Sequence, residues 1–361
     1  MSKLEILKDV SLSDYTTLRV GGGASFFLKL TDKKQLPEVY DFVKRRKLKW
    51  FVLGGGSNVL FSDNNFSGLV IKNELKGITL NENGVWEVAA GENWDGWVEG
   101  TVENGWNGVE NLSGIPGTVG AAPVQNINAY GATVADVIYE VEVFSLQTNS
   151  FIRLKREECR FSYRDSIFKH NDGKDFIITK VFFKLKKTSV LNFDYASSSQ
   201  GIKKFFEKEG VSKPTALDVR RAVLHLRSNI GMLPGQFNSA GSFFKNTIVD
   251  NDTFQKIKDL VEMKFADKDK MFSPWYWEIN NNHTKISTAF LLECTKFNKR
   301  TYGHYNWRSC VGLSPLHSLS IVTKEKAKFE DVISFVEAID AEVFSVFSVH
   351  IEPEVVFVDK C

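Results

Sequence analysis

A glycine-rich turn directly after a short apolar strand constrains the fold of this chain more than any other feature. The run Gly54-Gly55-Gly56-Ser57-Asn58 follows a predicted strand over 49–53. Successive backbone N–H groups in such a turn form a concave site for an anion. A Rossmann turn would need another glycine at position 59 and a helix from there, but Val59 begins a second apolar run. The turn also lacks the Gly-Lys-Ser/Thr of a P-loop. We therefore expect either a plain tight turn or a pyrophosphate site of a non-Rossmann kind.

The elements predicted around this turn indicate an α+β fold. An amphipathic helix over 36–48, with a proline at its start, precedes the strand. Alternating and apolar runs predict strands over 59–61, 68–71 and 175–185 and hairpins over 78–89 and 137–154. Helices are expected over 94–102, 214–228, 286–297 and 329–347, and two further strands over 316–322 and 351–358.

A second loop, over residues 112–131, is rich in small residues and low in charge. Small residues let the backbone approach a flat ligand closely, and exposed N–H groups can meet phosphate or ring carbonyls. A tightly packed turn between strands is the alternative. Two such loops, each after an apolar strand, favour a large nucleotide cofactor.

The composition is that of an ordinary globular chain, and it narrows the classes of partner. With 361 residues the chain is long enough for roughly two to three domains. A formal net charge of +2 gives no reason to expect a nucleic acid or an anionic membrane as partner. The four cysteines have no Cys-x-x-Cys spacing, so we expect no metal site and no disulfide framework. Because neither a signal region nor a membrane-length apolar run is present, we expect a cytoplasmic protein.

The run Gly241-Ser242-Phe243-Phe244-Lys245-Asn246 combines two bulky aromatic residues with three polar ones. Burying a polar group without a partner costs roughly 1–3 kcal/mol. We therefore expect the phenylalanines to be buried and the polar groups to line a cavity beside them. The Ser242 hydroxyl is a candidate proton donor there, and a hydrogen-bonded serine at a strand edge is the alternative.

Together these segments resemble the UDP-N-acetylenolpyruvoylglucosamine reductases, the flavoenzymes of peptidoglycan precursor synthesis. The resemblance is carried, in the family's order, by residues 53–60, 115–120, 125–131, 159–169, 241–246 and 351–355. It implies an FAD-binding fold of the vanillyl-alcohol-oxidase (PCMH) type in two subdomains, plus an α+β substrate-binding domain. It also implies non-covalent FAD, NADPH as hydride donor, and the enolpyruvyl ether of UDP-N-acetylglucosamine as the small-molecule substrate of a monomeric enzyme.

The resemblance further implies a domain organisation. Residues 1–75 would form the first FAD-binding subdomain and residues 76–213 the second. A tyrosine-loop insertion at 187–213 is typical of the family's longer variant. Residues 214–347 would form the substrate-binding domain, and 348–361 a C-terminal strand that returns to the active site.

Roles for single residues follow from the same resemblance. Arg164 would bind the substrate carboxylate, Ser242 would donate a proton to carbon, and Glu354, rather than Glu352, would be the catalytic acid of the C-terminal motif. The expected cofactor-binding residues are Gly54, Gly55, Gly56, Ser57, Asn58, Pro116, Gly117, Thr118, Gly120, Ala121, Gln125, Asn126, Tyr130 and Gly131. The expected substrate-binding residues are Tyr163, Tyr195, Lys245 and Asn246.

The chain departs from the family pattern after the helix over 214–228. A Lys-Leu-Pro-x-Pro stretch is usual there, but residues 228–235 lack its lysine, for which Lys245 or Lys285 would have to compensate. Two other functions stay open: a non-catalytic flavin-binding relative, and a flavin oxidase of the same fold. The first would be expected to lose one of Arg164, Ser242 and Glu354. The second often links its flavin to His or Cys, and neither residue occurs in the two cofactor loops.

Overall fold

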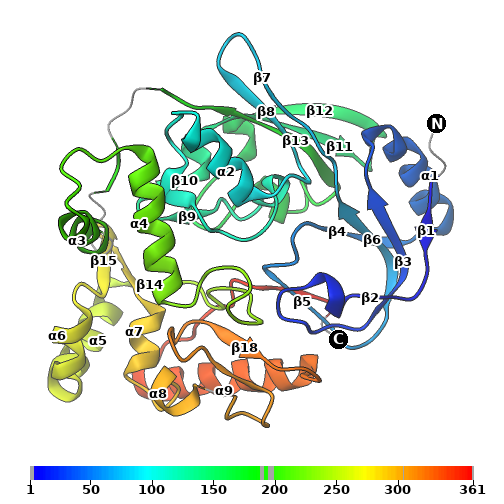
Figure 1. Cartoon of the computed structure of the whole chain (residues 1–361). Coiled ribbons are helices and arrows are strands. Elements are labelled where there is room, and N and C mark those ends of the chain that lie inside the picture. The colour runs from blue at the N-terminus through cyan, green and yellow to red at the C-terminus, as the bar shows by residue number, and fades with distance from the viewer. Residues whose placement is uncertain (1–3, 188–190, 194–198, 304, 360–361) are drawn as a thin grey trace. The chain divides into compact units, whose positions relative to one another are not determined.

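The computed structural model describes residues 4–187, 191–193, 199–303 and 305–359 (Figure 1). Two compact units form. The first comprises Met1–Ser11, Gly23–Gly56 and Asn65–Ser228, and the second Leu12–Gly22, Ser57–Asn64 and Asn229–Cys361. None of the described helices combines the length and the apolar character that a membrane span requires.

The first unit contains a five-stranded sheet covered by one helix. Its strands are ordered β1-β3-β6-β4, and β2 also pairs with β3. β3, β6 and β4 are parallel, so helix α1 provides the crossover that parallel strands require. The apolar face of α1 packs on the sheet through Leu36, Val39 and Val43. The elements are β1 (Ile6–Leu7), β2 (Val10–Ser11), β3 (Gly23–Leu30), α1 (Leu36–Arg46), β4 (Lys49–Leu53) and β6 (Phe66–Asn73).

A second, antiparallel sheet in the first unit has the order β12-β11-β13-β8-β7. Helix α2 (Trp94–Glu103) packs on it, and the Trp97 and Phe183 rings stack with centroids 4.2 Å apart. Helices α3 (Ser199–Glu209) and α4 (Ala216–Asn229) share a small apolar core of their own. The strands are β7 (Ile78–Leu80), β8 (Val85–Ala89), β11 (Ile138–Ser145), β12 (Ser150–Lys155) and β13 (Phe176–Lys184), with a minor pair β9 (Asn128–Ala129) and β10 (Ala132–Thr133).

The second unit surrounds a large aromatic core that includes Phe243, Phe244, Trp275, Phe290 and Phe335. A three-stranded sheet has the order β14-β16-β15, and two small pairs are β17-β18 and the parallel β19-β5. The strands are β5 (Val59–Phe61), β14 (Thr247–Asp250), β15 (Tyr276–Asn280), β16 (His283–Ile286), β17 (Val311–Leu313), β18 (Ile321–Thr323) and β19 (Val356–Val358). The helices are α5 (Asn251–Lys264), α6 (Ala266–Phe272), α7 (Thr288–Glu293), α8 (Lys299–Tyr302) and α9 (Phe329–Phe347).

Three predicted elements are shorter in the structure than the sequence suggested. The helix expected over 286–297 is only α7, because Ile286 belongs to β16 and the Ser287 side chain caps the helix start by accepting the Phe290 N–H. The strand expected over 316–322 begins at Ile321, because a turn closed between Ser314 and Ser320 precedes it. The strand expected over 351–358 is regular only from Val356.

The compact units and the predicted domains divide the chain differently. Helix α4 was predicted to begin the substrate-binding domain, but it lies in the first unit, where Arg220 forms an ion pair with Asp95. Residues 12–22 and 57–64 were predicted within an FAD-binding subdomain and lie in the second unit. The functional assignment of the domains stays a prediction.

Candidate active site

The two glycine-rich loops meet in the first unit. A Cβ atom added to Gly55 would lie 2.7 Å from the Gly117 Cα atom. One added to Gly54 would lie 2.8 Å from the Thr118 Oγ1 atom and 3.2 Å from the Ala121 Cβ atom. Side chains at positions 54 and 55 would therefore collide with the second loop. This close approach brings Gly54 and Gly55 next to the predicted cofactor residues at 117–121.

Backbone conformation also requires glycine in this region. Gly56 has a φ of 68° and Gly117 a φ of 122°, both in the range that side chains disfavour. A Cβ atom at Gly120 would lie 2.5 Å from the Ala90 Cβ atom. Gly54, Gly55 and Gly117 stay partly exposed, so the two loops present backbone without side chains there, which suits the approach of a flat or anionic group. These residues therefore fit a dinucleotide cofactor.

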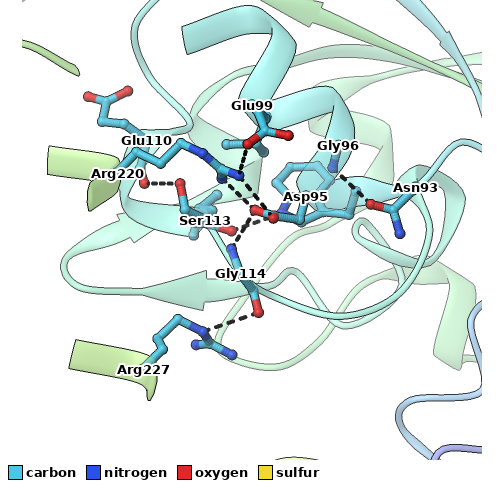
Figure 2. Close-up of polar contacts among 12 residues, drawn as sticks. Asn93, Asp95, Gly96, Glu99, Glu110, Ser113, Gly114, Arg220 and Arg227 are labelled. Carbon is cyan, nitrogen blue, oxygen red and sulfur yellow. Dashed lines mark hydrogen bonds and ion pairs between the residues drawn. The ribbon is translucent and has the colours of Figure 1, made fainter. Parts of the chain in front are cut away.

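Side chains of helices α2 and α4 hold the start of the second loop through the backbone N–H and carbonyl of Gly114 (Figure 2). The Asp95 carboxylate accepts the Gly114 N–H at 2.6 Å and two hydrogen bonds from Arg220 at 2.5 and 3.0 Å. The Arg227 Nε atom donates to the Gly114 carbonyl at 3.2 Å. Burial opposes ionisation of Asp95, but the bonds from Arg220 and Gly114 outweigh it and hold the pKa of the carboxyl below its usual value. Charged side chains thus fix both the N–H and the carbonyl of Gly114.

The start of α2 runs along the same loop. The Trp94 N–H donates to the Gly117 carbonyl at 3.2 Å, and the Trp94 indole Nε1 to the Leu112 carbonyl at 2.9 Å. The Val119 N–H donates to the Glu92 carbonyl at 2.9 Å. Bonds from three successive parts of the loop therefore leave its backbone little freedom, which is the preorganisation that a cofactor site needs.

The predicted catalytic residue Arg164 lies on a tight turn in the first unit. Ser162 and Asp165 exchange backbone hydrogen bonds of 3.1 and 3.2 Å across it. Arg164 itself has a φ of 53°, a conformation uncommon for a residue with a side chain. Such strain is often found at functional sites. The carboxylate of the next residue, Asp165, lies 2.8 Å from the His170 Nε2 atom.

The second glycine-rich loop supports this turn. The Asn126 Nδ2 atom donates to the Ser162 carbonyl at 2.8 Å, and the Ser166 hydroxyl donates to the Val124 carbonyl at 2.8 Å. Lys169 donates to the Arg164 carbonyl at 2.8 Å. The structure therefore brings Arg164, which is half-buried, to the loop that contains most of the predicted cofactor residues.

In the second unit, the predicted proton donor and the predicted acid lie on paired backbone segments. The Glu354 N–H donates to the Phe243 carbonyl at 2.8 Å, and the Lys245 N–H donates to the Glu352 carbonyl at 2.9 Å. Phe244 and Pro353 form the antiparallel bridge between them. Ser242 therefore directly precedes Phe243, whose carbonyl accepts the Glu354 N–H.

Burial within these two segments follows the sequence prediction. Phe243 and Phe244 are 0% and 1% exposed, whereas Ser242, Lys245 and Asn246 are half-buried. The two glutamates differ as well: the Glu352 side chain is 74% exposed and pairs with Lys245 at 2.9 Å, while Glu354 is half-buried. This contrast favours Glu354 over Glu352 as a residue of the site.

Several predicted residues have structural partners. Ser57 and Asn58 belong to the second unit, where the Asn58 Nδ2 atom donates to the Glu354 carbonyl at 3.2 Å. Asn246 accepts the Thr288 N–H at 3.2 Å. Tyr163 is 37% exposed. Tyr130 is half-buried, and its burial raises the pKa of its hydroxyl. Tyr195 lies outside the described residues.

Sequence reasoning missed Asp95 and Arg220, which hold the second loop, and Lys72, whose ammonium donates to the Gly54 carbonyl. None belongs to a motif, and the partners of Lys72 and Arg220 lie 18 and 125 residues away along the chain. One weak signal was available: Arg220 and Arg227 are spaced to lie on one face of a predicted helix.

Comparisons with known proteins agree with this geometry. Residues 24–154 match the FAD binding domain, and residues 233–358 match the C-terminal domain of UDP-N-acetylenolpyruvoylglucosamine reductase. The reductase of that name from Flavobacterium johnsoniae is 32% identical over 358 residues, which cover 98% of this chain and 99% of that protein. The one from Chromobacterium violaceum is 42% identical over 251 residues, covering 68% and 72%. The crystal structure of the Thermus caldophilus reductase has the same fold, with a TM-score of 0.65, 23% identity and 98% of each chain covered.

Proposed function

We propose that Arg164, Ser242 and Glu354 perform the catalysis in this chain, which belongs to the UDP-N-acetylenolpyruvoylglucosamine reductase family. The chain is thus a flavoprotein UDP-N-acetylmuramate dehydrogenase of peptidoglycan precursor synthesis. The observation that carries this proposal is the backbone pairing that sets Glu354 beside the Gly241–Asn246 run.

The substrate we propose is the enolpyruvyl ether of UDP-N-acetylglucosamine, and NADPH the reductant. FAD, bound non-covalently, would supply hydride to the terminal enol carbon. The residues proposed to hold it lie at 54–56 and 116–131, in the two loops that meet where Gly54 and Gly55 approach residues 117–121. The protein's own part is then to hold the substrate carboxylate, to stabilise the negative charge that develops, and to protonate the adjacent carbon.

Arg164 suits the first two tasks. Its planar guanidinium can bind a carboxylate through two parallel hydrogen bonds and can stabilise developing negative charge. The turn that presents it is fixed by Asn126 and Ser166. A guanidinium on a rigid turn loses little freedom when it binds, so its charge is available at the moment of reaction.

Ser242 suits the third task, with Glu354 as the acid beside it. A serine hydroxyl is a weak acid and needs neighbouring groups that stabilise its anion or return its proton. We propose that the hydroxyl gives its proton to the carbon next to the carboxylate and that Lys245 and Asn246 contact the substrate. Tyr195 is proposed to close over the substrate, as in the family's longer variant.

Two half-reactions test the proposal. The purified protein should be yellow, should lose its colour with NADPH, and should regain it on addition of the enolpyruvyl substrate. In Ser242→Ala, flavin reduction by NADPH should stay within about twofold of wild type, while reoxidation by substrate slows by about a hundredfold or more, as expected for loss of a general acid.

Ser239→Ala is the matched control. Its hydroxyl accepts the Gly241 N–H at 3.4 Å, so it is a serine of the same segment with a structural partner. Both half-reactions should survive in that variant. Equal loss of both half-reactions in Ser242→Ala would show that Ser242 only maintains the fold, and reoxidation by air alone would indicate an oxidase.

A further inference from the structure

We propose that Lys72 binds the diphosphate of the flavin cofactor from the strand beside the glycine-rich turn. This inference rests on the proposed function, because it takes FAD as the occupant of the site. Lys72 lies in β6 directly opposite Leu53, the last residue of β4 before the turn. Its Nζ atom donates a hydrogen bond to the carbonyl of Gly54, the first glycine.

The side chain lies on the face of the sheet that α1 does not cover. Its neighbours Ile71 and Leu69 contribute to the core beneath α1. Because side chains alternate along a strand, only one of Ile71 and Lys72 can point toward that helix. Lys72 is therefore free of the α1 core and on the side where its ammonium reaches the turn.

Among the described residues, no carboxylate pairs with the charge of Lys72. Within the described part of the chain, no carboxylate lies at ion-pair distance from its ammonium, and its one hydrogen bond goes to a neutral carbonyl. Burial lowers the pKa of Lys72, an effect that the more distant charge of Glu74 opposes. A half-buried ammonium without a counter-ion is costly, and a bound anion would remove that cost.

Lys76, in the same region, is a lysine whose charge is paired with a carboxylate, and it serves as a comparison. Its Nζ atom also donates to a glycine carbonyl, that of Gly91, at 2.6 Å. It additionally pairs with the Glu92 carboxylate at 3.3 Å, and its side chain is 60% exposed. Lys72 has the carbonyl contact without the carboxylate. Backbone N–H groups of a glycine turn together with one lysine form a recurring site for phosphate groups, so the missing partner is most simply a phosphate.

The test compares FAD with riboflavin, which has the same ring system and no phosphate. Flavin is removed from the full-length protein, and binding is followed by quenching of flavin fluorescence. Lys72→Met should weaken FAD binding by about tenfold to a hundredfold, as for loss of a charged hydrogen bond, and riboflavin binding by less than about twofold. Lys72→Arg should keep most of the FAD affinity. The flavin-free Lys72→Met protein should unfold at no lower urea concentration than wild type, because it has lost an uncompensated charge.

Lys76→Met is the control and should leave FAD affinity unchanged. Equal weakening of FAD and riboflavin by Lys72→Met would show that the lysine only supports the loop, and unchanged FAD affinity would also refute the proposal. If Lys72→Met does not fold, the same comparison of FAD with riboflavin is made with Lys72→Gln. The salt dependence of FAD binding by wild type then shows whether a charge contributes to the affinity. Failure of the wild-type protein itself to bind FAD would instead refute the proposed function.

Discussion

The Glu354 N–H donates a 2.8 Å hydrogen bond to the Phe243 carbonyl, which sets Glu354, the proposed acid, beside Ser242. A backbone bond of this kind does not depend on either side chain. Substitutions at Ser242 or Glu354 should therefore change the chemistry while the two segments stay paired. This makes both residues suitable for kinetic tests.

Glu354→Gln should slow reoxidation of the flavin by substrate by about a hundredfold or more, because an amide cannot transfer a proton. Glu352→Gln should keep most of the activity, because Glu352 is 74% exposed and solvent screens its ion pair with Lys245. Stopped-flow measurement of both half-reactions checks this. Similar losses in the two variants would contradict the choice of Glu354.

Arg164→Lys should lower the rate of substrate reduction by about a hundredfold, because an ammonium cannot bind a carboxylate through two parallel bonds. Flavin reduction by NADPH should be unchanged. Arg160→Lys serves as the control, since Arg160 precedes the same turn and forms an exposed pair with Asp172 at 2.5 Å. If Arg164→Lys reduced substrate at the wild-type rate, the proposed role would be wrong.

Arg220→Met should lower the free energy of unfolding by about 2 kcal/mol, because it leaves Asp95 without its cation. The Arg220 side chain is only 5% exposed and bonds to both Asp95 and Glu99. The neighbouring Arg221 is 56% exposed and pairs with Asp218 at 3.5 Å, so Arg221→Met should be nearly neutral. Urea unfolding measures the free energy of unfolding of both variants. An equal decrease in the two would show that the buried pair of Arg220 stabilises the protein no more than the exposed pair of Arg221.

The stability of the protein should fall as the pH is lowered from about 6.5 toward 4, partly through His317. Burial, together with repulsion by Lys299, lowers the pKa of His317 from 6.5 to about 4. The unfolded chain therefore binds a proton in this range before the folded protein does, and acid favours unfolding. His317→Asn, which keeps an acceptor for the Leu319 N–H, should reduce this dependence. Urea unfolding at pH 7 and pH 5 tests the difference, with the exposed His283→Asn as the control.

The parts of the fold that could be predicted are those in which a local pattern determines the outcome. Helix α9 has the predicted bounds because its apolar spacing is regular over Phe329–Phe347. The apolar run over 286–297 was misjudged for the opposite reason. Except for Lys296, its residues are buried or half-buried, so no clear periodicity separates the end of β16 from the short helix α7.

The site could be predicted only where its residues sit in motifs. The glycine loops, Arg164 and the Gly241–Asn246 run were predicted in this way, and their roles stay predictions. Their spacing does not say that Gly55 and Gly117 lie side by side. Lys72 and Asp95 could not be found, because their importance lies in which distant group they meet. A charged residue without a motif looks like any solvated one until the fold supplies its partner.

The pairing of β5 with β19 has a consequence for how the protein is made. β5 precedes most of the described elements along the chain, whereas its partner Val356–Val358 follows all of them. Both glycine-rich loops are complete long before that, since they end by residue 131. A nascent chain can therefore complete the loops of the first unit before β5 gains its partner. Glu354, the proposed acid, leaves the ribosome after every other residue proposed for the site.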